Sequence, residues 1–470
     1  MRARASTYAL RAWYRLVPYR SIMGRRMDIN RRAGLLAKPR RRTASVPFMT
    51  AEIDRQTRIL DAAERRFLVD GFERCSVESI ANDARASKRE IYRDWKSKSD
   101  LFIAVANRIF ADADVDLLAA RPENREMRPT LVFLARHLFD LFVTDRNRDL
   151  FRASVVAIRH FPDLASDIHS KRLTAWAQFG GYFEELIAGN KIQVAGAYAA
   201  ANRFGSLCVE GSRYLLGYPA PAEPIRAMQS AKMVDLFLNG YRVSAADPLA
   251  DPIGQDQQAA HAATSPVTRP PVQTRMSPHK QAAMFDALLR EFLEKGYHRA
   301  NMAIVATAVG ASKSTIYRQF GSKEGGFEQL VMRRVQQLAE AEPFALIPGE
   351  TLESALARLC RNILDRHLTP DNIAIVRALI EESRTFPELG RKYYDSALML
   401  SVRALRMVLH HYDVAEPDDP TVRAFHVLAT YGSRFIAFPT PPNDDERAAL
   451  SDEATAIFLH GVAVSQESSQ

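Results

Sequence analysis

The sequence predicts an all-α protein made of two tandem copies of one helical unit. Apolar residues recur at three- and four-residue spacings through most of the 470 residues, as in Leu131, Leu134 and Leu138, which is the period of a helix with one buried face. Residues 87–95 and 312–320 share a Ser-Lys-x-x-Ile-Tyr-Arg pattern and lie 225 positions apart. Together these observations predict repeated helical domains rather than a sheet.

Residues 1–50 form a basic arm before the first copy. The arm holds twelve Arg and Lys38 against the single acid Asp28, so it contributes +12 to a chain of net charge +9. The other 420 residues therefore sum to about −3, and overall basicity is no argument for nucleic-acid binding. Three interpretations stay open: a disordered arm that grips phosphate or a minor groove, a transit-peptide-like composition, or a true start at Met49.

Residues 51–102 are expected to form a small head with a helix–turn–helix. Ser76 is a candidate N-cap for a two-turn helix, which is interrupted at Arg85. Ser87 then opens a second short helix, and Glu90 three residues later completes a Ser-x-x-Glu capping box. This second helix is the candidate for contact with nucleic acid.

The charge around the two short helices favours contact with DNA. Residues 85–98 hold six Lys or Arg against two acids, and residues 310–323 hold three against none. A basic, hydroxyl-bearing helix with a free N-terminus can bind phosphates and enter a major groove about 12 Å wide. One copy alone is equally consistent with a surface helix whose charges are solvated, but a repeated pattern favours DNA.

The residues predicted to touch groove edges or phosphates lie in or just after these helices. They are Ser87, Lys88, Arg89, Tyr92, Arg93, Lys98, Ser312, Lys313, Ser314, Thr315, Tyr317 and Lys323. Of these, the two lysines at the start of the following helix, Lys98 and Lys323, are expected to meet phosphates.

The rest of the chain is divided by composition and period. Residues 103–244 are expected to be a larger helical body, whose apolar stripes form either a ligand cavity or plain core packing. Residues 245–278 contain six prolines and no apolar period, which is typical of a linker. The head is repeated by residues 279–335 and the body by residues 336–463, and residues 464–470 form a polar tail.

The spacing of repeated motifs indicates how the second copy arose. Phe-Pro-acid-Leu turns at 161–164 and 386–389 lie 225 residues apart, as the heads do, whereas Gly-Ser-Arg-aromatic motifs at 211–214 and 432–435 lie 221 apart. One four-residue deletion is therefore expected in the second copy. A period this long indicates duplication of a complete unit, not a solenoid.

Both heads resemble the N-terminal domain of TetR-type transcriptional regulators over about 45 residues each. In the first copy the resemblance rests on Gly71-Phe72, Ala86-Ser87-Lys88 and Ile91-Tyr92. In the second it rests on Gly310-Ala311-Ser312-Lys313 and Thr315-Ile316-Tyr317. It implies an all-α fold in which each unit has a three-helix DNA-binding head and a helical ligand-binding and dimerisation body.

Two departures from the family pattern are expected to soften the heads. The turn before the second short helix usually carries Gly, which Gly310 supplies and Arg85 does not; a non-Gly residue with positive φ costs roughly 1 kcal/mol. Gly325 and Gly326 lie inside a predicted helix, where each costs up to about 1 kcal/mol relative to Ala. These departures motivate an alternative function, a protein-interaction or dimerisation module in which one or both heads no longer bind DNA.

The resemblance implies a transcriptional repressor that binds a double-stranded DNA operator and is released by a small-molecule effector of unknown identity. Most family members are homodimers; here one chain holds two heads, so an intramolecular pseudo-dimer or a four-headed homodimer is expected. Half-sites one helical turn apart need heads about 34–36 Å apart, and a 34-residue coil spans about 30–35 Å. The short basic helices expected to read DNA, within residues 87–95 and 312–320, are called the reading helices. Because they differ in sequence, the operator should be asymmetric.

Other classes of protein are not indicated. The three cysteines, Cys75, Cys208 and Cys360, lack Cys-x-x-Cys spacing, which favours a reduced cytoplasm and no structural metal. Nucleotide-binding and hydrolase motifs are missing from the sequence, the Ser277-x-x-Lys280 match lies at the linker edge, and adjacent His410 and His411 would occupy different helical faces. No enzyme activity, cofactor or membrane span is expected, since no uncharged apolar run reaches about 18 residues.

Overall fold

A computed structural model of the chain describes residues 46–113, 126–160, 177–194, 196–241, 277–340, 342–437 and 441–463. Most of the basic arm, the turn at 161–164, nearly all of the linker and the tail lie outside the described residues. Within these ranges the regular structure is α-helix and 3₁₀-helix plus one isolated bridge between Ile192 and Ala463, so the all-α prediction is confirmed. None of the described helices is both long and apolar enough to cross a bilayer.

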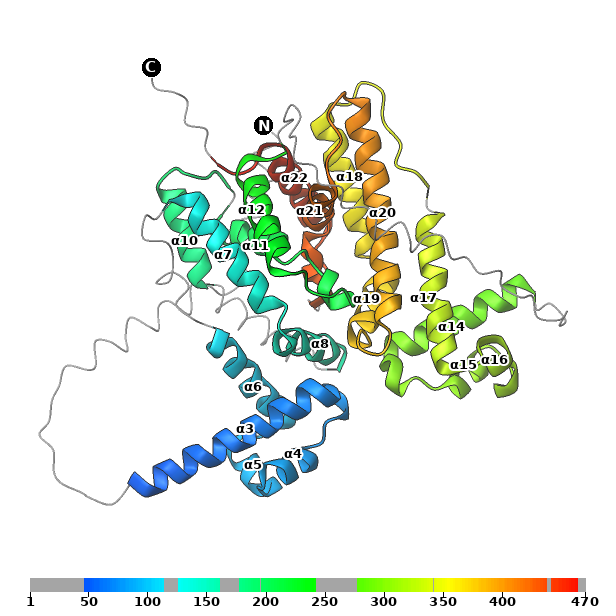
Figure 1. Cartoon of the computed structure of the whole chain (residues 1–470). Helices are drawn as coiled ribbons and strands as arrows, with labels where there is room; N and C mark the ends of the chain where they lie inside the picture. Colours follow the sequence, from blue (N-terminus) through cyan, green and yellow to red (C-terminus); the bar gives the residue numbers. More distant parts are fainter. Residues whose placement is uncertain are drawn as a thin grey trace, which may run out of the picture. The chain divides into compact units, whose positions relative to one another are not determined.

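The chain divides into two compact units, which are drawn with their helix labels in Figure 1. The first unit comprises residues 1–241 and 334–470, and therefore holds the first head and both bodies. The second unit, residues 242–333, holds the second head.

The first head is built on a long helix with a kink near its end. Its helices are α3 (Val46–Arg74), α4 (Val77–Ala84), α5 (Lys88–Asp94) and α6 (Lys98–Ala113). Gly71 interrupts α3 with φ 77° and ψ 161°, a conformation that glycine adopts without steric cost. Phe67, Phe72 and Phe102 then meet in the core, with ring centroids 5.1–5.8 Å apart.

The second head repeats this arrangement. Its helices are α14 (Pro278–Arg299), α15 (Met302–Ala308), α16 (Lys313–Phe320) and α17 (Lys323–Ala339). Gly296 kinks α14 with φ 72° and ψ 167°, nearly the values of Gly71. Phe292, Tyr297 and Phe327 pack at 5.3–5.9 Å between ring centroids, in the place of the three phenylalanines of the first head.

The two bodies contain matching helices. In the first body these are α7 (Met127–Phe142), α8 (Asp145–His160), α10 (Ala177–Ala188), α11 (Ala197–Cys208), η1 (Arg213–Leu216) and α12 (Glu223–Asn239). In the second they are α18 (Leu352–His367), α19 (Pro370–Glu381), α20 (Pro387–His411), α21 (Asp419–Ala429), η2 (Tyr431–Ala437) and α22 (Asp444–His460). The bounds of α7 and α18 differ by 225 throughout, and those of α12 and α22 differ by 221.

The deletion in the second copy occurs in two steps rather than one. Asn190 (φ 51°) and Asp413 (φ 55°) are equivalent left-handed residues after α10 and α20, and they lie 223 apart. The next backbone hydrogen bond also matches at this offset, from Lys191 N to Leu186 O and from Val414 N to Leu409 O, both 2.9 Å. Two residues are therefore lost before this cap and two after it. The expectation of a single four-residue deletion is wrong.

The two bodies pack on each other through α11 and α12 of the first and α21 and α22 of the second, side by side in Figure 1. One apolar core crosses the interface, with Phe204 and Phe237 on one side and Phe425 and Phe458 on the other. The backbones touch where α12 and α22 end: an added Cβ at Gly240 would lie 2.5 Å from Leu459. Single-chain pairing of two bodies is the arrangement that a pseudo-dimer requires.

Ion pairs tie the first head to the first body. Glu64 of α3 accepts hydrogen bonds from Arg108 of α6 at 2.6 Å and from Arg146 of α8 at 2.5 Å. Burial alone would raise the pKa of Glu64, but the bonds from Arg146 and Arg108 outweigh burial, so its pKa is lowered. At the positions equivalent to Glu64 and Arg146 the second copy has Leu289 and Asp371, which cannot form the same pairs.

Candidate DNA-binding interface

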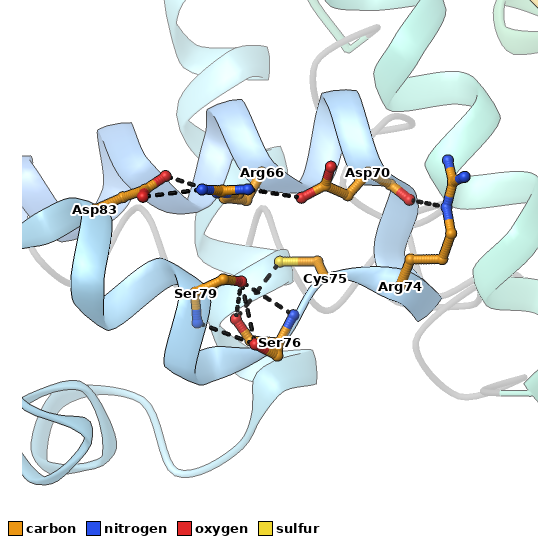
Figure 2. A network of polar contacts seen from close by, with 7 residues as sticks. All are labelled: Arg66, Asp70, Arg74, Cys75, Ser76, Ser79 and Asp83. Carbon is orange, nitrogen blue, oxygen red and sulfur yellow. Dashed lines mark hydrogen bonds and ion pairs between the residues drawn. The ribbon is translucent and has the colours of Figure 1, made fainter.

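In the first head, α4 precedes the reading helix α5. It is held in place by its N-cap and by ion pairs to α3. Ser76 is its N-cap, as predicted, and accepts a hydrogen bond from Ser79 N at 2.9 Å. Arg66 of α3 bonds both oxygens of Asp83 at 2.6 and 2.9 Å and also reaches Asp70 at 3.4 Å (Figure 2). This network fixes α4 on α3 and so orients the turn that follows.

The turn into the reading helix has the same backbone in both heads. Arg85 has φ 50° and Gly310 has φ 58°, so the position does adopt positive φ, which is the condition for the expected cost at Arg85. After each, the next residue bonds back to the preceding helix at 2.9 Å, from Ala86 N to Ala81 O and from Ala311 N to Ala306 O. An L-residue in this conformation brings Cβ close to the following carbonyl, so Arg85 carries a strain that Gly310 does not.

Each reading helix begins at a serine N-cap. In α5 the predicted capping box is present: Ser87 Oγ accepts from Glu90 N at 3.2 Å, and Glu90 Oε2 accepts from Ser87 N at 2.7 Å. The bond from Ser87 N to the Glu90 carboxylate, together with one from Ser87 Oγ to the same oxygen at 2.8 Å, lowers the pKa of Glu90. In α16 Ser312 Oγ accepts from Thr315 N at 3.1 Å. The two serines thus set the start of each reading helix.

The first reading helix presents fewer free charges than its sequence indicates. Lys88 Nζ lies 2.9 Å from Glu78 Oε2 of α4, in an ion pair whose side chains are 53% and 68% exposed. Arg93 contacts Asp94 at 3.4 Å. Arg89 and Tyr92 are exposed, and within the described residues Arg89 contacts no acid.

The second reading helix is less neutralised. Lys313 and Arg318 are exposed and form no ion pair with any described carboxylate. Lys313 Nζ lies 5.7 Å from the ring centroid of Tyr317, whose side chain is also exposed. The residue equivalent to Glu78 is Ala303, so no acid is available there. Arg318 is not among the predicted contact residues. The sequence does offer a signal for it, because Arg318 is the equivalent of Arg93, which is among them.

The lysines that follow the reading helices have a local structural role. Lys98 Nζ lies 4.6 Å above the Phe72 ring, and Lys323 Nζ lies 5.0 Å above the Tyr297 ring and donates to His298 O at 3.0 Å. Both ammonium groups therefore cover the kinked end of the long helix of their own head. Phosphate contact by these lysines stays a prediction.

Gly325 is required by the fold of the second head, contrary to the expectation that it softens the head. An added Cβ at Gly325 would lie 2.3 Å from Phe320 O, closer than any side chain can approach. The close approach follows from Gly321, whose φ of 76° turns the chain sharply after α16. Gly326 has more room, since its added Cβ would lie 3.3 Å from a methyl group of Leu288.

Other kinds of site are not apparent in the described ranges. There, no three His, Cys, Asp or Glu side chains lie together as a metal ion would need. The three thiols are buried, and burial raises the pKa of Cys75 to about 11 and that of Cys360 to about 12, so neither is a thiolate at neutral pH.

A three-helix head with a capped, exposed basic helix defines the class of helix–turn–helix DNA-binding proteins. Two family models match this chain twice each. The model for bacterial regulatory proteins of the tetR family matches residues 59–105 and 285–330, and that for the AefR-like transcriptional repressor C-terminal domain matches residues 129–243 and 354–461. The chain belongs to the TetR family of DNA-binding transcriptional regulators and contains its domains in tandem.

Individual relatives cover only part of the chain. Uncharacterized HTH-type transcriptional regulators of Mycobacterium bovis and Mycobacterium tuberculosis are 40% identical over 50 residues, which is 11% of this chain and 25% of theirs. A TetR regulator from Agrobacterium tumefaciens is 21% identical, with 40% of this chain and 96% of that chain covered and a TM-score of 0.32. The flavonoid-responsive regulator FrrA is 24% identical, with 38% and 92% covered and a TM-score of 0.33.

Proposed function

We propose that the chain is a transcriptional repressor in which one polypeptide supplies both DNA-reading heads. The observation that carries this proposal is the repeated, N-capped reading helix with exposed cationic and hydroxyl side chains. Pairing of both bodies within the chain supports a single-chain pseudo-dimer. The match to a C-terminal domain described as that of a transcriptional repressor supports repression rather than activation.

The proposed contacts divide into phosphate and base contacts. Lys313, with its exposed ammonium group, binds phosphate and positions the head without regard to sequence. Arg89 in the first head and Thr315 in the second face base edges, because each lies in the first turn of its reading helix, where helix–turn–helix proteins read bases. Tyr92 and Tyr317 lie on the same exposed faces and contact the DNA backbone.

Selection from a random duplex library with the full-length protein tests the proposal. The expected product is an asymmetric operator with two different half-sites one helical turn apart, about 34–36 Å. Arg89→Ala should relax base preference in one half-site only, and Thr315→Ala in the other only. Failure to enrich any sequence at low salt, or enrichment of a perfect palindrome, contradicts the proposed two-headed reading.

Release by a small molecule is the second part of the proposal. A cavity of about 10 Å³ lies where the bodies meet, lined in part by Leu207, Met233 and Val427. That volume holds at most one water molecule, so an effector would need a different opening in one of the bodies. Fluorescence anisotropy of the labelled, selected operator measures whether any compound in a panel of apolar aromatic molecules releases the protein from DNA. Compounds that bind the protein tightly but leave its affinity for the operator unchanged would contradict this part of the proposal.

A protein-interaction module remains the second candidate, and two observations in the first head favour it there. Lys88 is neutralised by Glu78, and Arg85 occupies a strained turn. Under this alternative the first head contributes nothing to DNA binding, so Arg89→Ala would leave the selected operator unchanged.

A further inference from the structure

Oppositely charged side chains meet in pairs across the body–body interface. Arg203 of α11, only 1% exposed, bonds Glu453 of α22 at 2.9 Å. Its other two nitrogens donate to Leu428 O at 2.7 Å and to Leu450 O at 2.6 Å, both across the interface. At the rim, Lys232 of α12 forms an ion pair with Asp418, the N-cap of α21.

The pseudo-symmetry of the bodies shows what each face would meet in a copy of itself. In this region equivalent residues lie 221 apart, so Glu453 corresponds to Lys232, Arg203 to Ala424, and Asp418 to Ala197. If two first bodies paired in the same way, Arg203 would face Lys232 of the copy. If two second bodies paired, Asp418 would face Glu453 of the copy.

A like-charge contact at this place is unfavourable because water cannot screen it. Arg203 lies in the apolar core of the interface, where an uncompensated charge is costly to bury. In a pairing of first bodies it would exchange a carboxylate for an ammonium group. The rim pair is about two-fifths exposed and contributes less, but its sign favours the same pairing.

A third ion pair across the interface also forms only between a first body and a second body. Glu210 of the first body lies 3.3 Å from Arg423 of the second. Their equivalents are Tyr431 and Asn202, so neither self-pairing would re-form this contact. Every one of these three ion pairs therefore needs one first body and one second body.

We infer that these charges determine partner choice: each body accepts the other kind of body and rejects a copy of itself. The charges therefore disfavour association of two chains through like bodies. Covalent linkage raises the effective concentration of the unlike body, which favours the pair within one chain over the same pair between two chains, so that two heads, and not four, reach one operator. This inference concerns the free protein and is independent of whether the heads bind DNA.

Sedimentation of the full-length chain, without DNA, tests the inference. The unmodified protein should sediment at its monomer mass of 52.8 kDa at all concentrations. Arg203→Glu should oppose Glu453 within the chain and attract Lys232 of a second chain, so we expect a concentration-dependent species of twice the monomer mass. Glu453→Lys should do the same through the second bodies, because the new lysine would face Asp418 of the copy.

Two double variants separate charge sorting from simple damage to the fold. Adding Lys232→Glu to Arg203→Glu should abolish the dimer, because the attraction between copies becomes repulsion. Combining Arg203→Glu with Glu453→Arg should restore the monomer, because opposite charges again meet within the chain, where the effective concentration is highest. Arg128→Glu, a reversal at an exposed pair with Asp235 inside the first body, is the matched control and should stay monomeric.

The inference is overturned if the unmodified chain sediments at twice its monomer mass. It is also overturned if Arg203→Glu stays monomeric with unchanged hydrogen exchange in α11 and α21. Equal dimerisation with and without Lys232→Glu would overturn it as well, because association would then not depend on the charge at position 232.

Discussion

The ion pair between Lys88 and Glu78 distinguishes the two reading helices. One substitution can remove it from the first head, and another can introduce its equivalent in the second. Replacing Glu78 with Gln removes the carboxylate that lies 2.9 Å from Lys88 and leaves the ammonium group free for phosphate. In the second head, Ala303→Glu introduces a carboxylate at the equivalent place beside Lys313. The two substitutions should have opposite effects on DNA binding.

The size of the effect follows from counterion release. Each phosphate neutralised by a lysine changes the slope of log K against log salt by about 0.9 for duplex DNA. Neutralising one phosphate more, or one fewer, therefore changes the ratio of affinities between roughly 50 and 200 mM salt by about threefold. We expect Glu78→Gln to steepen the slope by up to one unit and Ala303→Glu to flatten it by a similar amount.

Fluorescence anisotropy of a labelled operator, titrated at several salt concentrations, measures these slopes. Arg128→Glu provides a control for a change of surface charge outside the heads. If Glu78→Gln leaves the slope unchanged while Lys313→Ala lowers it by one unit, Lys88 does not face phosphate, and the first head binds differently from the second. If Glu78→Gln and Ala303→Glu both leave the slope unchanged, the assignment of Lys88 and Lys313 to phosphate contact is wrong.

Three further predictions concern stability. Arg85→Gly should remove the strain at φ 50° and stabilise the first head by about 1 kcal/mol, which would slow hydrogen exchange in α4 and α5 about fivefold, and unchanged exchange would show no strain there. Gly325→Ala should destabilise the second head by about 1–3 kcal/mol because its Cβ meets Phe320 O, whereas Gly326→Ala should be nearly neutral; equal melting shifts would contradict the close approach. Burial lowers the pKa of His426 to about 3, with nearby His367 adding to the effect, and burial lowers the pKa of His367 to about 4, so the second body should be fully stable above about pH 6.5 and lose about 4 kcal/mol by pH 5; His426→Gln should remove about half of that loss in a chemical denaturation series.

Local features of the heads were predictable from the sequence because they depend on residues three or four positions apart. Ser76 and Ser87 cap their helices as expected, since a hydroxyl can reach the free N–H groups of the next turn whatever the rest of the fold. That Arg85 lies in a turn that usually carries glycine was visible in the sequence, and the structure supplies its positive φ. The repeat itself was visible because both copies keep the same apolar positions.

Contacts between distant elements were not predictable in the same way. The sequence shows Lys88, Lys98 and Lys323 only as cations in or next to a reading helix. Packing decides that Glu78 pairs with the first, while the rings of Phe72 and Tyr297 lie beneath the other two. The need for Gly325 likewise depends on how sharply the chain turns at Gly321, which helix propensity cannot report.

By itself the sequence determined the helical class, the duplication and the two capped basic helices, because periodicity and capping act over one helical turn. Only the tertiary structure decided which charges remain free and that Arg203 reaches Glu453 across 250 positions of chain. The reason is physical: the energy of a charge depends on the groups and the water around it, and folding, not order along the chain, brings those groups together.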